Sequence, residues 1–479
     1  MTGALTSGYQ LNEDYEFFEI QNRLRESGRL IQTIAQYISE DFHRLRIYYP
    51  HRVLQNFFFG VHVTWMRVEL ALLGALSCFL LYRFARKINW DIPESLLLGL
   101  WVYSGAQMLV WWRMGTAENL GMFFLALALF FVETEFLFTA SLMLMALSKE
   151  TFMVIVPAIL FLKIWLDSET ARQPLWKSFR RHAGISAILG IFTLGQLVWI
   201  LKITGPVVAG YAGYEGFRWN SSLNAFLALA HASHAPLLAI TGFTAVWGFY
   251  FEKNRAAPGK SWLCPGAFFI LMITPLVLLF QKSGVADHYV LPGVFAFSFL
   301  FLYAYHILKK TLFVFFRILI LGSALTVTLY GFKDAAASGR QFAAEGRAVK
   351  TVVDTVREKT AADDAVLLVA DPARHFEWSY AIGHYLEWLG PRKNLYLFPI
   401  LRPNYSVFEK QLVYDSPKSP LKLYRGRLLN NIPSPDRIKA VVVLPTMEFW
   451  FLLQSKSWFD RFRYDRTTSG NFAVYCRKN

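Results

Sequence analysis

Apolar stretches follow one another along the chain from Val63 to Gly331, and polar links separate them. A membrane-spanning helix needs about 20 mostly apolar residues, and fewer where neighbouring protein shields it. The stretches of suitable length are residues 64–84, 94–112, 118–134, 136–147, 151–166, 184–203, 234–251, 263–280, 289–308 and 312–331. The pattern therefore predicts an all-α polytopic bundle of about ten transmembrane helices over residues 63–332.

Two of these stretches, 118–134 and 136–147, are short and are separated at Glu135. They fit either a tight hairpin of two short helices or one bent element, and the choice decides the side of every later link. Lysine and arginine in short links stay on the cytoplasmic side. If the two stretches are counted as two spans, all basic links fall on the cytoplasmic side, so we predict the hairpin. The basic residues of these links are Arg83, Arg86, Lys87, Lys163, Arg172, Lys177, Arg180, Arg181, Lys253, Arg255, Lys260, Lys309 and Lys310.

This crossing count places residues 1–62 and 335–479 outside the cytoplasm. In the first of these segments, Tyr15–Ile20 and Leu24–Tyr37 carry apolar residues at helical spacing. Such spacing predicts amphipathic helices that lie along the membrane surface or over the mouth of a site.

The segment from 335 to 479 has the pattern of a small α/β domain. A charged helix is expected over 340–360, and apolar runs predict further elements. The expected strands are 365–370, 395–399, 439–444 and 471–476, with a helix at 376–389. Strands alternating with helices indicate a parallel core. No glycine-rich phosphate loop follows the first strand, so an accessory lid is the expected role.

Composition agrees with a membrane protein. Hydrophobic residues make up 54% of the 479 and charged residues only 17%, whereas soluble domains carry about 25% charge. The net charge of +15 does not indicate nucleic acid, because the basic residues are concentrated in the links. Cys78, Cys264 and Cys476 have no ligand spacing, and we expect three unpaired thiols.

Four short polar segments share the predicted outer side: Asn12-Glu13-Asp14, Arg113 to Glu118, Ser148-Lys149-Glu150 and Asp287-His288-Tyr289. The carboxylates of Glu13 and Asp14 suit a general base, metal ligands, or charges at a helix N-terminus. The cations Arg113 and Lys149 stand on neighbouring turns, where they are well placed to bind a phosphate.

A second polar group, Glu40, Asp41 and His43, contains residue types that bind a divalent metal. Its spacing matches no defined metal motif, and a solvated interfacial helix end is the favoured interpretation. No cofactor is therefore assigned, and a divalent metal stays an open possibility.

Taken together, the acidic pair, the sequence GTAENLG with Glu118, the sequence SKET with Lys149 and Glu150, and the sequence HYVLP with His288 and Tyr289 resemble the GT-C superfamily of glycosyltransferases. That group includes protein O-mannosyltransferases and lipid A aminoarabinose transferases. The resemblance covers about residues 1–300. It departs from the family at His288, where related sequences often have arginine.

The resemblance implies an integral-membrane enzyme of the bacterial inner or plasma membrane. It would transfer a sugar from a polyprenyl-phosphate donor to a lipid, glycan or protein acceptor of the cell envelope, with inversion. It would make Asp14, together with Glu13, the catalytic carboxylate. It would place Arg113, Lys149 and His288 near the donor phosphate, with Glu118, Glu150 and Tyr289 in the same substrate-binding site.

Two other classes of function remain open: a lipid-linked sugar flippase or transporter, and a non-catalytic envelope assembly protein of the same fold. Convergence of Asp14 and Lys149 in one outward-facing cavity would favour the enzyme. Family members also begin with a transmembrane helix, so we expect an additional N-terminal span before Met1 in the natural reading frame. The alternative is that the span at 64–84 carries the N-terminus across unaided.

Overall fold

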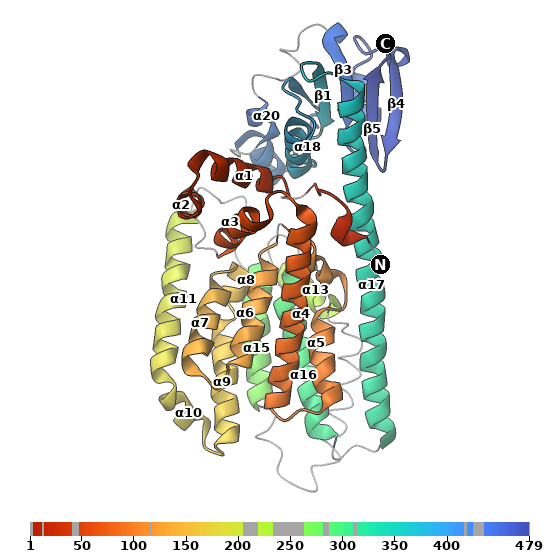
Figure 1. Cartoon of the computed structure of the whole chain (residues 1–479). Helices are drawn as coiled ribbons and strands as arrows, with labels where there is room; N and C mark the ends of the chain where they lie inside the picture. The colour runs from red at the N-terminus through yellow and green to blue at the C-terminus, as the bar shows by residue number, and fades with distance from the viewer. Residues whose placement is uncertain are drawn as a thin grey trace. The chain divides into compact units, whose positions relative to one another are not determined.

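The computed structural model describes residues 3–478, except 12–13, 41–46, 115, 205–218, 233–262, 281–286, 310–313, 416–418 and 425–434. The chain forms two compact units (Figure 1). The membrane unit comprises Ile34–Leu54 and Met66–Ser338, and the sheet unit comprises Met1–Thr33, Gln55–Trp65 and Gly339–Asn479. The expected domain boundaries at 62 and 335 stay a prediction.

The membrane unit is built from helices at most of the predicted positions. They are α4 (Val63–Lys87), α5 (Ile92–Val102), α6 (Glu118–Phe130), α7 (Glu135–Ala146), α8 (Glu150–Met153), α9 (Val156–Thr170), α10 (Leu175–Arg181), α11 (Ala183–Thr204), α13 (Trp219–Ala232), α15 (Leu263–Phe280) and α16 (Leu291–Leu308). The expected span at 234–251 lies outside the described residues.

Among the described residues, three helical segments are long and apolar enough to cross a membrane: Val63–Lys87, Glu150–Thr170 and Leu263–Phe280. A fourth is formed if α10 and α11, which meet at a bend of 70°, count as one span. Helices α5, α6, α7 and α16 are apolar but shorter. A polytopic helical protein is thus consistent with the structure, and the number ten stays a prediction.

The predicted hairpin at 118–147 is confirmed as two separate helices. Helix α6 ends at Phe130, α7 begins at Glu135, and the two pack along each other. The turn between them exposes backbone carbonyls that the helix cannot satisfy. Lysines from neighbouring helices bind these carbonyls: Lys87 Nζ donates to Phe130 O at 2.7 Å, and Lys163 Nζ donates to Val132 O.

The expected span at 94–112 is wrong in its second half. Helix α5 ends at Val102, and a short 3-10 helix, η2 (Ala106–Trp111), follows after Gly105. Gly105 has a φ of +112°, which breaks the helix, and its N–H donates to Gly331 O at 3.0 Å. A Cβ at Gly331 would lie 2.7 Å from the Ser104 Cβ, so this glycine permits the close approach.

Other helices also differ from expectation. The span at 312–331 and the charged helix at 340–360 are parts of one continuous helix, α17 (Val314–Lys359). Helices α3 (Tyr48–Phe59) and α13 were not predicted. In α3, aromatic residues stand at both ends and polar residues such as His51, Arg52, Gln55 and Asn56 lie between them, so no simple apolar helical face is visible in the sequence.

The sheet unit contains the predicted α/β domain. Its sheet has the order β2-β1-β3-β5-β4, with bounds β1 (Ala365–Ala370), β2 (Leu395–Pro399), β3 (Ile438–Val443), β4 (Tyr464–Ser469) and β5 (Phe472–Arg477). Strand β1 pairs in parallel with β2 and β3, so the parallel core is confirmed. Strand β5 pairs antiparallel with β3 and β4, and β4 was not predicted.

Two apolar cores flank this sheet. One contains residues of α17, of α18 (Phe376–Trp388) and of the N-terminal segment, including Tyr15 and Phe18. The other contains Phe451 of α21 (Glu448–Gln454) and Phe459. Helix α1 (Glu16–Ser27) therefore buries its apolar face within the sheet unit, where Phe18 stacks on Trp388. The N-terminal segment and the C-terminal domain share one core.

Candidate functional site

Three of the four predicted polar segments supply residues to one cluster in the membrane unit. Lys149, which precedes α8, forms an ion pair with Glu118, the first residue of α6. The Lys149 ammonium also lies 4.2 Å from the ring centroid of Tyr289, in η4 (Asp287–Val290). We call Glu118, Lys149 and Tyr289 the lysine cluster. Lys149 is 31 residues from Glu118 and 140 residues from Tyr289 in the sequence, and helix packing brings the three side chains together.

The turns that carry Arg113 and Lys149 are hydrogen-bonded to the segment around α3. Arg52 of α3 is fully buried and donates from Nη2 to Met114 O at 2.6 Å, next to Arg113. The backbone N–H of Ile47 donates to Leu147 O at 3.1 Å, just before Lys149. Two hydrogen bonds from one short segment thus fix the turns that carry the candidate cations.

Unsatisfied polar atoms lie at the same turns. Within the described residues, Glu118 Oε2, Arg113 Nε and Thr151 Oγ1 are buried and have no hydrogen-bond partner. Buried polar atoms in proteins are nearly always hydrogen-bonded, and each exception requires an explanation. One acceptor and two donor groups without partners at these turns suit a polar ligand with both hydroxyl and anionic groups.

The basic links meet at the other end of the same bundle. Lys309 donates to Asp91 at 2.7 Å and to Glu94 at 2.9 Å, and so joins the link after α16 to the link after α4. Lys87 lies 3.6 Å from Glu133, and His182 lies 3.0 Å from Glu135. The links predicted to share a side therefore touch one another, as do the turns of the lysine cluster.

The remaining predicted residues of this face are placed as follows. Arg113 ends the turn after η2 and is half-buried. Glu150 is the first residue of α8 and is half-buried. His288 belongs to η4, and its side chain lies outside the described residues. Tyr289, beside it, stacks on Phe280 with ring centroids 5.7 Å apart.

Asp14 lies in the sheet unit and is fully buried. Its Oδ2 accepts a hydrogen bond from the Gln10 N–H at 2.9 Å. Gln10 is itself held by α17, because its Nε2 donates to Phe342 O at 3.0 Å, and by Tyr385 of α18, which donates to Gln10 O. The carboxylate therefore stabilises a turn. Its catalytic assignment stays a prediction, and Glu13 lies outside the described residues.

The metal prediction is not tested. Asp41 and His43 lie outside the described residues, and Glu40 ends α2 (Leu30–Glu40) with its side chain undescribed. In the described part of the chain, no group of three His, Cys, Asp or Glu side chains is arranged to hold a metal ion.

Sequence reasoning missed two buried arginines of the membrane unit, Arg52 and Arg67. Arg67 lies in the second turn of α4 and is completely buried, close in sequence to Glu69, which contacts His51 at 3.0 Å. A charge this near the start of an apolar span is a signal for function, because its insertion is costly. Arg67 sits in the sequence VTWMRVEL, where that signal was present.

A second polar cluster closes the end of β1. Asp371 is fully buried, pairs with Arg402 at 2.7 Å, and accepts a hydrogen bond from Tyr405 at 3.1 Å. Burial lowers the pKa of the neighbouring His375 to about 4, although the Asp371 charge opposes the shift. His375 Nδ1 accepts the Asp371 N–H at 3.2 Å, which requires a neutral ring. The Asp371 and Arg402 charges are paired within the cluster, and we assign it a structural role.

No family model matches the chain, and no curated protein matches its sequence. Among solved structures, the chain is similar to ArnT from Cupriavidus metallidurans bound to undecaprenyl phosphate. The two share 14% sequence identity with a TM-score of 0.50, over 98% of this chain and 95% of that one. At this identity the likeness shows the fold alone. The chain thus has the fold of ArnT.

Proposed function

We propose that this chain is an integral-membrane glycosyltransferase that moves a sugar from a polyprenyl-phosphate donor to an acceptor at the outer face of a bacterial inner or plasma membrane. The proposal includes about ten spans, with the lysine cluster, the N-terminal segment and the C-terminal domain on the outer side. The solved neighbour of the same fold is bound to undecaprenyl phosphate, which supports a lipid of this class as the donor carrier.

The observation that carries the proposal is the convergence of Lys149, Glu118 and Tyr289 from three separate turns. An ammonium has three N–H donors. Glu118 takes one of them and holds the side chain in position, so the others are available to phosphate oxygens. The side chain of Lys149 keeps 14% of its surface exposed, whereas that of Glu118 has none, so a ligand reaches the lysine first.

The open atoms of the same turns suit the rest of the donor. Glu118 Oε2 can accept a sugar hydroxyl, and Arg113 Nε can donate to a second phosphate oxygen. A cationic site of this kind stabilises the charge that develops on a departing phosphate, so the reaction needs no general acid.

The proposed reaction is one inverting displacement. The acceptor oxygen attacks the anomeric carbon as a carboxylate removes the hydroxyl proton, and the bond from that carbon to the phosphate oxygen breaks. The electron pair leaves with polyprenyl phosphate. Asp14 is proposed as the carboxylate, with Glu13 as its neighbour. Base catalysis of this type contributes roughly 10²–10⁴-fold to rate.

Binding of undecaprenyl phosphate to the purified full-length protein, followed by native mass spectrometry, tests the lysine cluster. Lys149→Gln alone would leave the Glu118 charge buried without its partner. The comparison is therefore between Glu118→Gln and the double variant Glu118→Gln/Lys149→Gln. Neither variant leaves a buried carboxylate without its partner. We expect the double variant to lose roughly 1.5–3 kcal/mol of binding free energy relative to Glu118→Gln, as for one charge-assisted hydrogen bond.

Equal affinity of the two variants for undecaprenyl phosphate would show that Lys149 does not bind the phosphate. Donor binding without any sugar transfer to extracted envelope acceptors would instead favour a non-catalytic protein or a transporter of the same fold. Matched unfolding temperatures of the two variants provide the control for folding.

A further inference from the structure

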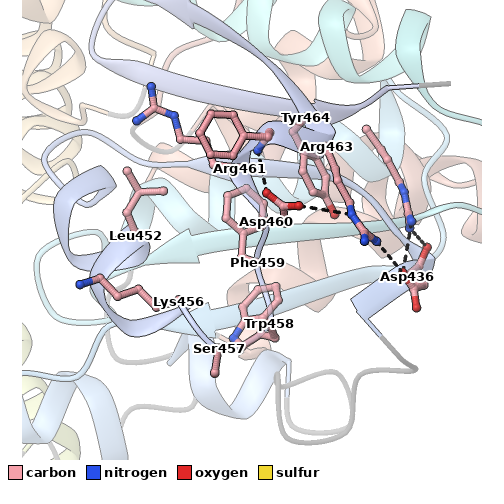
Figure 2. A pocket seen from close by; sticks show the side chains of 12 residues that line it. Asp436, Leu452, Lys456, Ser457, Trp458, Phe459, Asp460, Arg461, Arg463 and Tyr464 are labelled. Atoms are coloured by element: carbon pink, nitrogen blue, oxygen red, sulfur yellow. Dashed lines mark hydrogen bonds and ion pairs between the residues drawn. The ribbon is translucent and has the colours of Figure 1, made fainter.

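The C-terminal domain contains a hollow of about 570 Å³ beside the core that Phe451 and Phe459 occupy. It lies between the end of α21, the segment 455–462 and the ends of β4 and β5 (Figure 2). Small-molecule sites in proteins commonly measure about 300–1,000 Å³, so the hollow has the size of a ligand site. It belongs entirely to the sheet unit and is separate in sequence from the lysine cluster.

The walls of the hollow carry an excess of positive charge. Four cations line it, namely Lys456, Arg461, Arg463 and Arg477, against the two carboxylates Asp436 and Asp460. Arg463 lies 3.3 Å from Asp460 and 3.8 Å from Asp436, and Arg477 lies 3.2 Å from Asp436. Both carboxylates are thus already paired.

Lys456 and Arg461 are the cations that remain available. Both are exposed, and neither side chain makes a hydrogen bond or an ion pair with another described residue. Figure 2 draws interactions at Arg463, Asp436 and Asp460 but none at Lys456 or at the Arg461 guanidinium. The unpaired charge is therefore concentrated on one side of the hollow, which favours an anionic ligand there.

The frame that carries these cations is fixed. Asp460 accepts the Phe462 N–H at 3.0 Å and so caps the short helix that contains Arg461. Trp458 lines the hollow and packs on Phe398 and Phe451, at ring-centroid distances of 6.0 and 6.1 Å. The backbone around Arg461 therefore needs little ordering when a ligand enters, and the cost of ordering is confined to the exposed side chains.

Aromatic side chains stand beside the free cations. Phe462 is 85% exposed, although it is one of the larger apolar side chains of the domain. Trp458 contributes a second aromatic surface to the wall. The C–H face of a sugar ring is apolar and buries well against an aromatic ring. Cations and aromatic faces in one hollow therefore match a ligand that is both anionic and a sugar.

We propose that this hollow is a binding site for an anionic carbohydrate, in which Lys456 and Arg461 bind a phosphate or carboxylate and Phe462 contacts the sugar ring. The proposal concerns ligand binding by the C-terminal domain and does not depend on the transferase activity. Carbohydrates of this class occur both free and as headgroups of glycolipids, and both sources present the same chemistry to the hollow.

Calorimetric titration of the full-length protein in a neutral detergent, with glucose 1-phosphate as the probe, tests the site. The variant is Lys456→Gln/Arg461→Gln, and the matched control is Lys393→Gln/Lys439→Gln, which removes two exposed cations elsewhere in the same domain. We expect at least about tenfold weaker binding in the variant, since charge-assisted contacts are lost, and unchanged binding in the control. Equal affinity in variant and wild type would overturn the proposal.

Two further arms test whether the sugar ring is recognised and whether anionic phospholipid headgroups occupy the hollow instead. Inorganic phosphate should bind more weakly than glucose 1-phosphate, and Phe462→Ala should remove the difference; equal binding of both probes to the wild type would overturn the sugar assignment. Titration is then repeated in nanodiscs of phosphatidylcholine and of phosphatidylglycerol. Binding that persists in both membranes supports a sugar site. Loss of binding in phosphatidylglycerol alone would show that the hollow is occupied by lipid headgroups and would overturn the proposal.

Discussion

Lys149 and Glu118 form an ion pair in which the carboxylate is fully buried while the ammonium stays partly exposed. The pair joins the start of α6 to the turn before α8. Buried charges need their partners, because removing one member leaves the other unpaired in a medium of low dielectric constant. The same contact therefore serves both stability and the proposed binding of a phosphate.

The first prediction concerns the stability of this ion pair. Lys149→Met should lower the free energy of unfolding by about 3–5 kcal/mol, because Glu118 is left charged and buried. Lys149→Met/Glu118→Gln should recover much of the loss, as a double-mutant cycle measured by thermal unfolding in detergent would show. Additive effects in the cycle would mean that the two residues do not interact.

The second prediction concerns Asp14. Asp14→Asn keeps an oxygen that can accept the Gln10 N–H, so folding should be preserved. Sugar transfer should fall by at least roughly 10²-fold, because an amide cannot take a proton. Donor binding, measured on the same sample, should be unchanged. Full transfer in this variant would remove Asp14 from the reaction and leave it the structural role described above.

The third prediction concerns the packing of α6 against α8. A Cβ at Gly121 would lie 2.3 Å from the Phe152 ring and 2.6 Å from Ser148 Oγ. Gly121→Ala should therefore destabilise the protein by about 1–3 kcal/mol and displace the Lys149 turn. Gly190 of α11 has no atom within 4 Å of the corresponding position, so Gly190→Ala provides the matched control. Similar unfolding temperatures for both variants would contradict the close packing.

The fourth prediction concerns pH. The pKa of His375 is lowered to about 4 from an ordinary value near 6.5, chiefly by burial. The unfolded chain therefore binds more protons than the folded domain between these values, and stability rises with pH across this window. Acidification from pH 6.5 to 4 should cost the C-terminal domain up to about 3 kcal/mol. Hydrogen exchange of β1 in the full-length protein measures this loss, and His375→Gln should flatten the dependence.

The fifth prediction concerns sidedness. Thr467 of β4 and Thr170 at the end of α9 are both exposed and permit the same substitution. A membrane-impermeant thiol reagent on spheroplasts, in which the outer envelope is removed, should label Thr467→Cys. It should label Thr170→Cys only after the membrane is permeabilised. The reverse result would invert the proposed topology.

Several elements were predictable because one local signal dominated them. Strand β1 is a continuous apolar run with every residue buried, and its predicted bounds match the structure. The edge strand β4 was missed because only Tyr464 of its six residues is buried, so its pattern resembles a polar loop. Gly331 resembles a helix end in the sequence, yet α17 continues through it, because the glycine accommodates the backbone at Gly105.

The lysine cluster was predictable in part, since counting spans grouped Glu118, Lys149 and Tyr289 on one face. The count could not show that Lys149 reaches Glu118 and Tyr289, because that depends on helix packing. It also could not show that Arg52 holds the Met114 turn, since this contact crosses 62 residues. Long-range contacts of this kind are specified by shape rather than by a local pattern.

The short hairpin of α6 and α7 has a consequence for the surrounding bilayer. These helices have 13 and 12 residues, about 18–20 Å at 1.5 Å per residue, whereas the hydrocarbon layer is about 30 Å thick. Their connecting turn is bound by Lys87 and Lys163, which draws charge towards the middle of the membrane. A protein segment shorter than the bilayer thins the lipid beside it. If α6 and α7 cross the bilayer, we therefore expect headgroups and water to reach deeper next to α7, whose Phe136 is 80% exposed, and a polar group moving between the leaflets to meet a lower barrier there.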